Sequence, residues 1–228
     1  MTKTTGFWGV AVLLVFASVG FAQYTMTLTG LGDGATFGGV FVSPYWGTIQ
    51  GNGVNYTGYM ICDDYATHSE LNQSWNATGE NATNIDSGVK FDAVSYHGHT
   101  AQEGYDAVAY LASQLMSGSN FLNYNAQVNY SYAIWDVMNP GLNILPNSGG
   151  TLVQNLINTA FLNTASGYSG PAVTVFTPYP NLNASQEFLV VGGPAIATPE
   201  PAAAAVLGFD LLSLAAIVFF MRRHRVRA

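Results

Sequence analysis

Polar and apolar residues alternate along the first part of the chain in a pattern that predicts β-strands. The alternation covers residues 25–31, 38–49 and 53–65. Turn signals separate these segments: an Asp-Gly pair at 33–34 and a Gly-Asn-Gly run at 51–53. We therefore expect about four antiparallel strands in this part of the chain.

After residue 88 the apolar spacing changes to that of α-helices. Residues 104–116, 128–138 and 151–165 repeat apolar side chains at intervals of three and four, which predicts three amphipathic helices. The second helix should end at Asn139-Pro140, because proline disfavours helical backbone at the residue before it. The apolar face expected on the third helix consists of Leu152, Leu156, Ala160 and Phe161.

Strand character returns at residues 171–180 and 186–194, so the helices are inserted between two groups of strands. This order predicts an α+β domain over residues 23–191, in which an antiparallel sheet or a small sandwich packs against a helical insertion. Residues 192–201 are rich in Gly, Pro, Ala and Thr and indicate a linker after this domain.

The first 22 residues have the pattern of a cleavable secretory signal peptide. Lys3 lies in a short polar lead, an apolar run follows over residues 7–16, and small residues precede an expected cleavage site after Ala22. The alternative is an N-terminal membrane anchor, but the apolar run is short for a span. Export through the Sec machinery follows from this interpretation.

Residues 202–221 contain no Lys or Arg and are long enough to cross a bilayer as a helix. Asp210 costs roughly 3 kcal/mol at the centre of such a helix, whereas the ten Val, Leu, Ile and Phe residues contribute roughly 0.3–0.6 kcal/mol each. Insertion therefore remains marginally favourable. The alternative, a buried C-terminal core helix, does not account for the basic tail over residues 222–228, which carries Arg222, Arg223, Arg225 and Arg227.

Those arginines predict the orientation of the span, because positive charge is retained on the cytoplasmic side. The domain should then lie outside the inner membrane. Pro199-Glu200-Pro201, followed by a single span and a basic end, resembles the PEP-CTERM protein-sorting signal of Gram-negative bacteria. The resemblance implies recognition by an exosortase, cleavage near the tripeptide, and transfer to the cell envelope or to an exopolysaccharide-rich extracellular matrix.

The charge of the predicted domain limits the classes of molecule that it can bind. Residues 23–198 hold eleven Asp and Glu against Lys90 alone, a formal charge of −10. Such a domain repels nucleic-acid phosphates, so nucleic-acid binding is excluded. Cys62 is the only cysteine, so no internal disulfide can form; its side chain is either a buried small hydrophobe or a reactive thiol.

Two segments around Cys62 and Trp135 resemble surface thioester domains. Residues 59–65, "YMICDDY", are similar to the cysteine strand of that family, and residues 131–137, "SYAIWDV", to its Gln-x-Ala-Ile-Trp helix. The family captures amines through a Cys-Gln thioester. Ser131 stands at the place of the glutamine and has no carboxamide for a thiol to displace, while Gln127 lies one helical turn earlier and could take part only with a shifted strand register.

Other candidate sites are less specific. Asp63, Asp64, His68, His97 and His99 could approach one another around a metal, but their spacing matches no metal motif, and we expect no metal and no other cofactor. The chain also has no nucleophile elbow and no phosphate-binding loop, so we expect no enzyme activity. An aromatic carbohydrate-binding surface, or equally a packed sheet, could be made of Tyr45, Trp46, Tyr56, Tyr59 and Trp75.

The sequence thus predicts an exported, membrane-anchored envelope or matrix protein with a structural or adhesive role. Its expected partners are the Sec machinery, an exosortase, the membrane and an exopolysaccharide. The alternatives are a covalent thioester-type adhesin acting through Cys62 and a carbohydrate-binding module.

Overall fold

The computed structural model describes residues 23–86, 88–140 and 150–193, which belong to one compact unit, Ala22–Thr198. The predicted signal peptide, the sorting motif, the membrane span and the basic tail lie outside the described residues. The strands are β1 (Gln23–Gly30), β2 (Thr36–Phe37), β3 (Val40–Phe41), β4 (Tyr45–Gly51), β5 (Val54–Cys62), β6 (Ser74–Asn81), β7 (Val173–Pro178) and β8 (Phe188–Val191). The helices are α1 (Ala101–Leu115), the short 3-10 helix η1 (Asn120–Leu122), α2 (Tyr124–Met138) and α3 (Gly150–Asn163).

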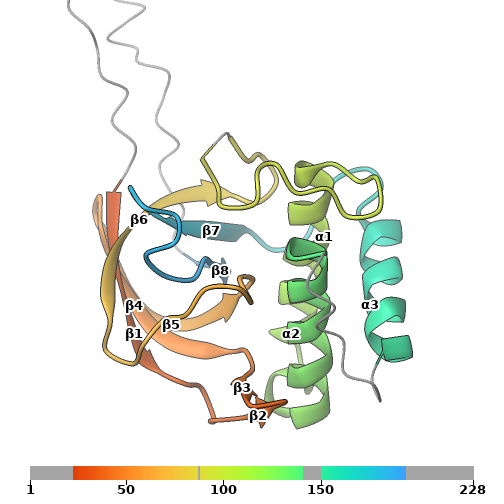
Figure 1. Ribbon diagram of the computed structural model, residues 1–228, viewed down its shortest axis with the longest axis horizontal. Coiled ribbons are helices and arrows are strands. Elements are labelled where there is room, and N and C mark those ends of the chain that lie inside the picture. The colour runs from red at the N-terminus through yellow and green to blue at the C-terminus, as the bar shows by residue number, and fades with distance from the viewer. Residues whose placement is uncertain (1–22, 87, 141–149, 194–228) are drawn as a thin grey trace, which may run out of the picture. The chain divides into compact units, whose positions relative to one another are not determined.

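The α+β class and the helical insertion between two groups of strands are confirmed, but the sheet is neither open nor a sandwich. Six strands form a closed barrel in the order β1-β4-β5-β8-β7-β6, and β2 and β3 form a separate two-stranded sheet (Figure 1). Neighbouring strands of the barrel are antiparallel. Because β1 pairs with β4 on one side and with β6 on the other, the ring closes through the first strand.

Side chains alternate between the two faces of each strand, and the apolar ones fill the inside of this barrel. On β1, Tyr24, Met26 and Leu28 are buried, while the residues between them face outward. The predicted turn at residues 51–53 joins β4 to β5, and its three residues have positive φ angles (134°, 50° and 78°), as expected for a Gly-Asn-Gly hairpin. The interior of the barrel is one of two apolar clusters in the described domain.

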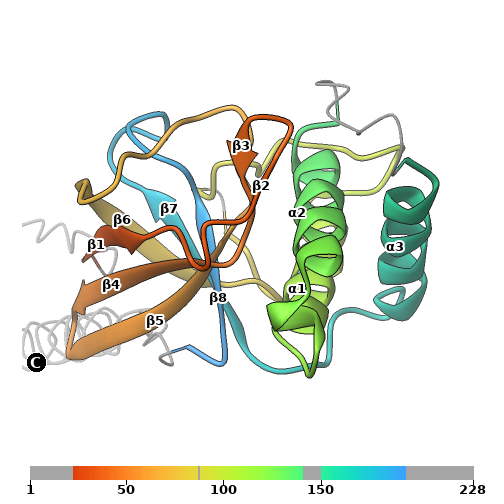
Figure 2. The ribbon, with the colours of Figure 1, turned by 90° about the horizontal axis from the view of Figure 1, so that it is seen from below.

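The second cluster lies between the barrel and the helices. Helices α1 and α2 stand beside the barrel and α3 packs on their far side (Figure 2). Thr100 begins α1 with a capping box, in which its side chain accepts from the backbone of Glu103 and the Glu103 carboxylate accepts from the backbone of Thr100. Helix α2 ends at Met138, directly before Asn139-Pro140, as predicted.

Two details of the prediction are wrong. Residues 74–81 form strand β6, which the sequence analysis did not expect because polar residues dominate the segment. On α3 the buried residues are Val153, Ile157 and Ala160, while Leu152 is 58% exposed, so the helix is turned by about one position from the expected face. In the ranges that the structure describes, no helix has the length and apolar character of a membrane span.

Candidate functional site

Cys62 is the last residue of β5 and lies beside helix α2. Its backbone N–H donates to the hydroxyl of Ser43 at 3.0 Å, and the backbone N–H of Ser43 donates to the hydroxyl of Ser131 on α2 at 2.9 Å. The indole N–H of Trp135 donates to the carbonyl of Cys62 at 2.9 Å. The two segments that resemble a thioester domain are therefore neighbours, and Ser131 takes part in a buried hydrogen-bond chain.

The thiol of Cys62 is not available for chemistry in this geometry. It is fully buried and donates to the carbonyl oxygen of Asp64 at 3.2 Å. Burial, followed by the nearby carboxyls of Asp64 and Asp63, raises its pKa well above the ordinary value, so the thiol stays protonated at neutral pH. Because the thiolate is the nucleophile, this environment opposes covalent catalysis.

Neither candidate carboxamide position offers a partner to this thiol. Position 131 holds serine, and the side-chain amide of Gln127 donates to the carboxylate of Asp33 and to the carbonyl of Phe121, both at 2.9 Å. Gln127 is thus fixed toward the turn after β1 and toward η1. The described geometry gives no support to a thioester at either of these two positions.

Directly after Cys62, the chain forms a loop that a buried ion pair holds in place. The carboxylate of Asp64 accepts the backbone N–H groups of Ala66 and Thr67, each at 3.1 Å, which shapes a tight turn. Its second oxygen binds the ammonium group of Lys90, and that ammonium also donates to the hydroxyl of Thr67 at 2.5 Å and to the carbonyl of Ser185 at 3.4 Å. One buried cation therefore joins three segments that are far apart in sequence.

Two further carboxyls, Asp63 and Glu187, lie buried beside this ion pair. Glu187 accepts from the phenol of Tyr105 at 2.5 Å, from the backbone N–H of Lys90 at 2.9 Å and from the hydroxyl of Thr177. Neither oxygen of Asp63 has a hydrogen-bond partner of acceptable geometry. Burial and then the nearby Glu187 raise the pKa of Asp63 well above its ordinary value. Burial raises the pKa of Glu187 too, but its three donors oppose the rise, so Asp63 is the acid that keeps the proton and Glu187 the one that holds the charge.

Outside this buried group the structure has an open cleft of about 390 Å³, a volume within the range of small-molecule sites. The β2–β3 hairpin and the loop that follows Cys62 supply most of its lining, and single residues after β1, on β4, on α2 and before β8 complete it. The hairpin can turn in two residues because Gly38 and Gly39 adopt φ angles of 61° and 83°. The aromatic residues that line the cleft are Phe41, Tyr45, Tyr65 and Trp135.

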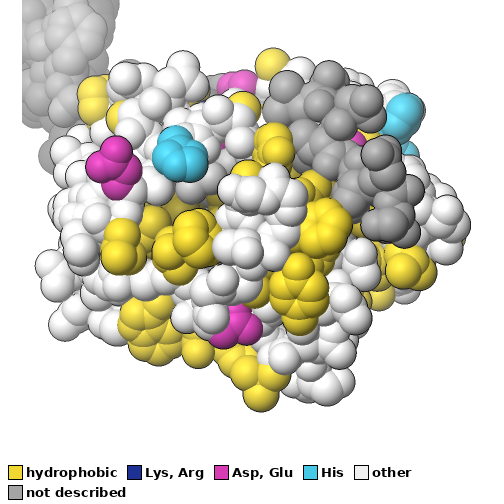
Figure 3. All heavy atoms as spheres, turned by 60° about the horizontal axis from the view of Figure 1, so that its bottom comes forward, with side chains coloured by type: hydrophobic (Ala, Val, Ile, Leu, Met, Phe, Trp, Pro, Cys, Tyr) yellow, Lys and Arg dark blue, Asp and Glu magenta, His cyan; other side chains and the backbone are white. Residues whose placement is uncertain are grey.

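The polar groups of the cleft come from the loop and from the residue before β8. His68 and Glu70 are exposed, and Gln186 donates its side-chain amide to the carbonyl of Asp64 at 2.9 Å. The rings of Tyr65 and Trp135 are 5.2 Å apart. Figure 3 turns the β2–β3 end of the molecule forward; hydrophobic side chains gather on this face, with a few acidic and histidine side chains between them. The arrangement suits a ligand that offers both apolar faces and hydrogen-bonding groups.

The five aromatic residues that were candidates for a carbohydrate-binding surface do not form one surface. Tyr45 and Trp75 are buried, and Tyr56 donates its hydroxyl to the carbonyl of Tyr59. Trp46 and Tyr59 are cross-strand partners on the outside of the barrel, with ring centroids 4.5 Å apart. Strand alternation separates the set, because neighbouring side chains such as Tyr45 and Trp46 point to opposite faces.

The residues considered for a metal are also dispersed. Asp64 binds Lys90, His97 lies edge-on against Tyr96, and His99 stacks on Phe161 at 3.9 Å. Across the part of the chain that the structure describes, no group of three or more His, Cys, Asp or Glu side chains is placed to hold a metal ion.

Sequence reasoning missed the centre of the buried group. In the sequence Lys90 stands as an isolated charge, and a single cation in an acidic domain is itself a sign of a specific partner. Glu187 begins an otherwise apolar run, "EFLVV", and an acid in such a run signals a buried carboxyl with dedicated donors. Gln186 carried no signal, because its role depends on the pairing of β5 with β8.

Comparisons with known proteins give little to add to this geometry. No family model matches the chain, and no curated protein matches it. Among solved structures, the chain has a weak similarity to the N-terminal thioester domain of fibronectin-binding protein SfbI from Streptococcus pyogenes. The TM-score is 0.42 at 11% sequence identity, over 77% of this chain and 95% of that one.

Proposed function

We propose that this protein is an exported adhesive protein of the bacterial envelope or matrix that binds a glycan non-covalently in the aromatic cleft. The observation that carries the proposal is the cleft itself, in which the exposed ring of Phe41 and the half-buried ring of Tyr65 lie beside hydrogen-bonding side chains, with the buried Trp135 behind them. Sugar rings present C–H faces that pack on aromatic rings, and their hydroxyls need polar partners at the edge. Both kinds of group occur here in one cavity.

The geometry around Cys62 favours non-covalent binding over the alternative of covalent capture. The thiol is buried and protonated, and Ser131 offers no carboxamide. The cleft, in contrast, is open, and residues 65 and 67–71 of the same loop line it.

The sequence supports the location. A signal peptide over residues 1–22 and a C-terminal arrangement of Pro199-Glu200-Pro201, an apolar segment and four arginines suit a protein delivered through Sec and an exosortase. In the cell envelope or the matrix, an exopolysaccharide is the glycan that the cleft would meet. The domain would then attach the envelope to the polysaccharide around it.

A glycan-binding measurement with two matched variants tests the proposal. The full-length protein in non-ionic detergent is presented to a glycan array, and hits are measured by titration. Tyr65→Ala removes a half-buried ring from the cleft and should weaken binding about tenfold or more, the loss expected for one aromatic contact in a site. Trp46→Ala removes a comparable ring from the outside of the barrel and should leave binding unchanged.

Thermal unfolding of both variants controls for loss of fold. Binding that persists in Tyr65→Ala and disappears in Trp46→Ala would move the site to the outer aromatic pair. No binding to any glycan by folded protein would refute the proposed function.

A further inference from the structure

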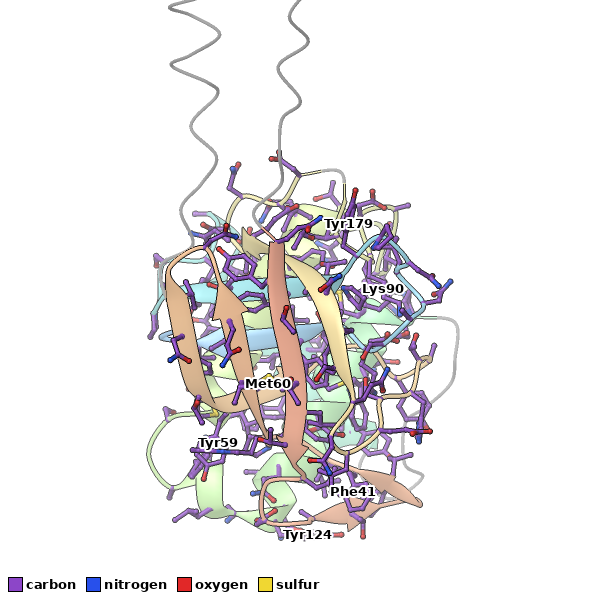
Figure 4. All side chains as sticks on the ribbon, turned by 90° about the vertical axis from the view of Figure 1, so that its left-hand side faces the viewer. Phe41, Tyr59, Met60, Lys90, Tyr124 and Tyr179 are labelled. Atoms are coloured by element: carbon purple, nitrogen blue, oxygen red, sulfur yellow. The ribbon has the colours of Figure 1, made fainter. Side chains whose placement is uncertain are left out.

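The described domain presents negative charge only. Its single Lys or Arg, Lys90 (labelled in Figure 4), is buried against Asp64 with 8% of its side chain exposed, and its ammonium group also donates to the hydroxyl of the lining residue Thr67. The charge over residues 23–198 is −10. A polyanionic glycan would therefore meet repulsion on approach, with no exposed Lys or Arg among the described residues to offset it.

One of the negative charges lies at the cleft itself. Glu70 is an exposed lining residue, and its carboxylate makes no hydrogen bond or ion pair with any residue that the structure describes. Its position is held from the backbone, because the N–H of Glu70 donates to the side-chain oxygen of Gln73 at 2.7 Å. An acid fixed in this way is able to pair with a ligand.

The cleft that Glu70 lines also contains aromatic rings, and this combination has a specific chemistry. The electron-rich faces of Tyr and Trp attract organic cations, and a carboxylate at the edge adds charge pairing. Resting on the proposed function, the geometry points to a glycan that carries protonated primary amines, such as an amino-sugar polymer lacking its N-acetyl groups. The half-buried ring of Tyr65, which packs on the buried Trp135, would contact the ammonium group, and Glu70 would pair with it.

A neutral glycan is the competing ligand, and it makes a different demand on the site. It would use the aromatic rings and the hydrogen-bonding groups. Its hydroxyls could donate to Glu70, but the side-chain oxygen of a glutamine at that position would accept them as well, so this role does not require the negative charge. The charge of Glu70 therefore decides between the two classes of ligand.

The test compares two probes that differ only in acetylation: the glucosamine tetramer and the N-acetylglucosamine tetramer. Both are titrated against the full-length protein in non-ionic detergent, at a pH where the free amine is protonated. The amine form should bind about tenfold more tightly, the size expected for one cation–π contact together with one exposed carboxylate. Glu70→Gln should reduce this ratio to about twofold, and added salt should reduce it as well.

Asp92→Asn is the matched control, because it removes one exposed negative charge from a residue that does not line the cleft. It should leave the ratio near its original value. A preference that falls equally in Glu70→Gln and Asp92→Asn would overturn the assignment to the cleft, since it would report only the overall charge.

The remaining outcomes separate the inference from the function on which it rests. Equal affinity for both tetramers, lost in Tyr65→Ala, would overturn the amine proposal and leave glycan binding standing. No binding to either tetramer, together with an array hit on another neutral glycan, would have the same meaning. No binding to any glycan would overturn both.

Discussion

Asp63 is a carboxyl group with both oxygens buried and no donor to satisfy them. A charged carboxylate in that position would be very costly, so the fold retains the neutral, protonated form. Glu187, with donors from Tyr105, Thr177 and the backbone of Lys90, has what Asp63 lacks. Two acids of similar burial therefore differ in charge because only one has hydrogen-bond donors.

The raised pKa of Asp63 predicts how stability depends on pH. The folded state binds this proton more tightly than the unfolded chain does, so its contribution is complete below the ordinary pKa of 3.8 and is lost as pH rises toward the folded-state value. Each such group changes the free energy of unfolding by about 1.4 kcal/mol per pH unit within that window. Asp63→Asn mimics the protonated acid, so its unfolding free energy, measured by denaturant titration from pH 4 to 8, should decline less steeply than that of wild type.

Asp92→Asn, which makes the same substitution at an exposed position, serves as the control for the loss of one acidic side chain. If Asp63→Asn keeps the wild-type slope, the proton belongs to Glu187 instead.

At the scale of the elements, Lys90 joins three segments that no sheet connects. They are the loop after β5, the segment before α1 and the β7–β8 connection. The loop carries Tyr65, His68 and Glu70 into the cleft, so the buried cation indirectly shapes the site. Breaking such a pair leaves one buried charge without a partner.

Lys90→Met should therefore lower the free energy of unfolding by about 3–5 kcal/mol, because it leaves Asp64 buried and charged. The double variant Lys90→Met, Asp64→Asn removes both charges and keeps an oxygen for the backbone N–H groups of Ala66 and Thr67, so it should recover most of the loss. Denaturant titration of the two variants checks this. Equal stability of Lys90→Met and wild type would show that the pair contributes nothing.

The sequence predicts those elements that depend on a local pattern of residues. The three helices, the Gly-Asn-Gly hairpin and the end of α2 before Pro140 depend on neighbouring residues, and they were predicted. Strand β6 was missed because Asn76, Thr78 and Asn81 dilute its alternation, and the face of α3 was misjudged because Leu152 and Val153 are both apolar. Closure of the barrel depends on pairing between strands distant in sequence, such as β5 with β8, and leaves no periodic trace.

The candidate site likewise has one part that the sequence predicted and one part that it did not. The closeness of Cys62 to α2 was expected from the two segments around Cys62 and Trp135, and the structure places them together. The cleft itself was not expected, because its lining comes mainly from the β2–β3 hairpin and the loop after β5, with single residues from four other parts of the chain, and no single segment contains its pattern. Tyr45 illustrates the difficulty, since it is both a barrel residue and a lining residue.

For the whole molecule, the sorting signal at Pro199-Glu200-Pro201 is a prediction that lies outside the described residues. In the native host, wild-type protein should leave the inner membrane and lose its C-terminal segment, while Glu200→Ala, Pro201→Ala should accumulate there uncleaved. Fractionation and the intact mass of the exported species measure both events. The same mass tests Cys62, since a thioester would lower it by one ammonia.

Recovery of the exported wild-type species with its arginine tail intact would argue against cleavage of the signal. A tagged C-terminus reached by a reagent confined to the periplasm would contradict the orientation.

Under the proposed function, in which the domain would hold a polymer at one place and the cell at another, the pairing of β5 with β8 has a mechanical consequence. The cleft loop leaves the end of β5, and the chain toward the C-terminus leaves the end of β8; because these neighbours are antiparallel, with Cys62 opposite Phe188, their two exits point in opposite directions. Tension between the polymer and the cell would therefore slide the strands along each other. The hydrogen bonds perpendicular to the strands would then bear the load together rather than opening one after another.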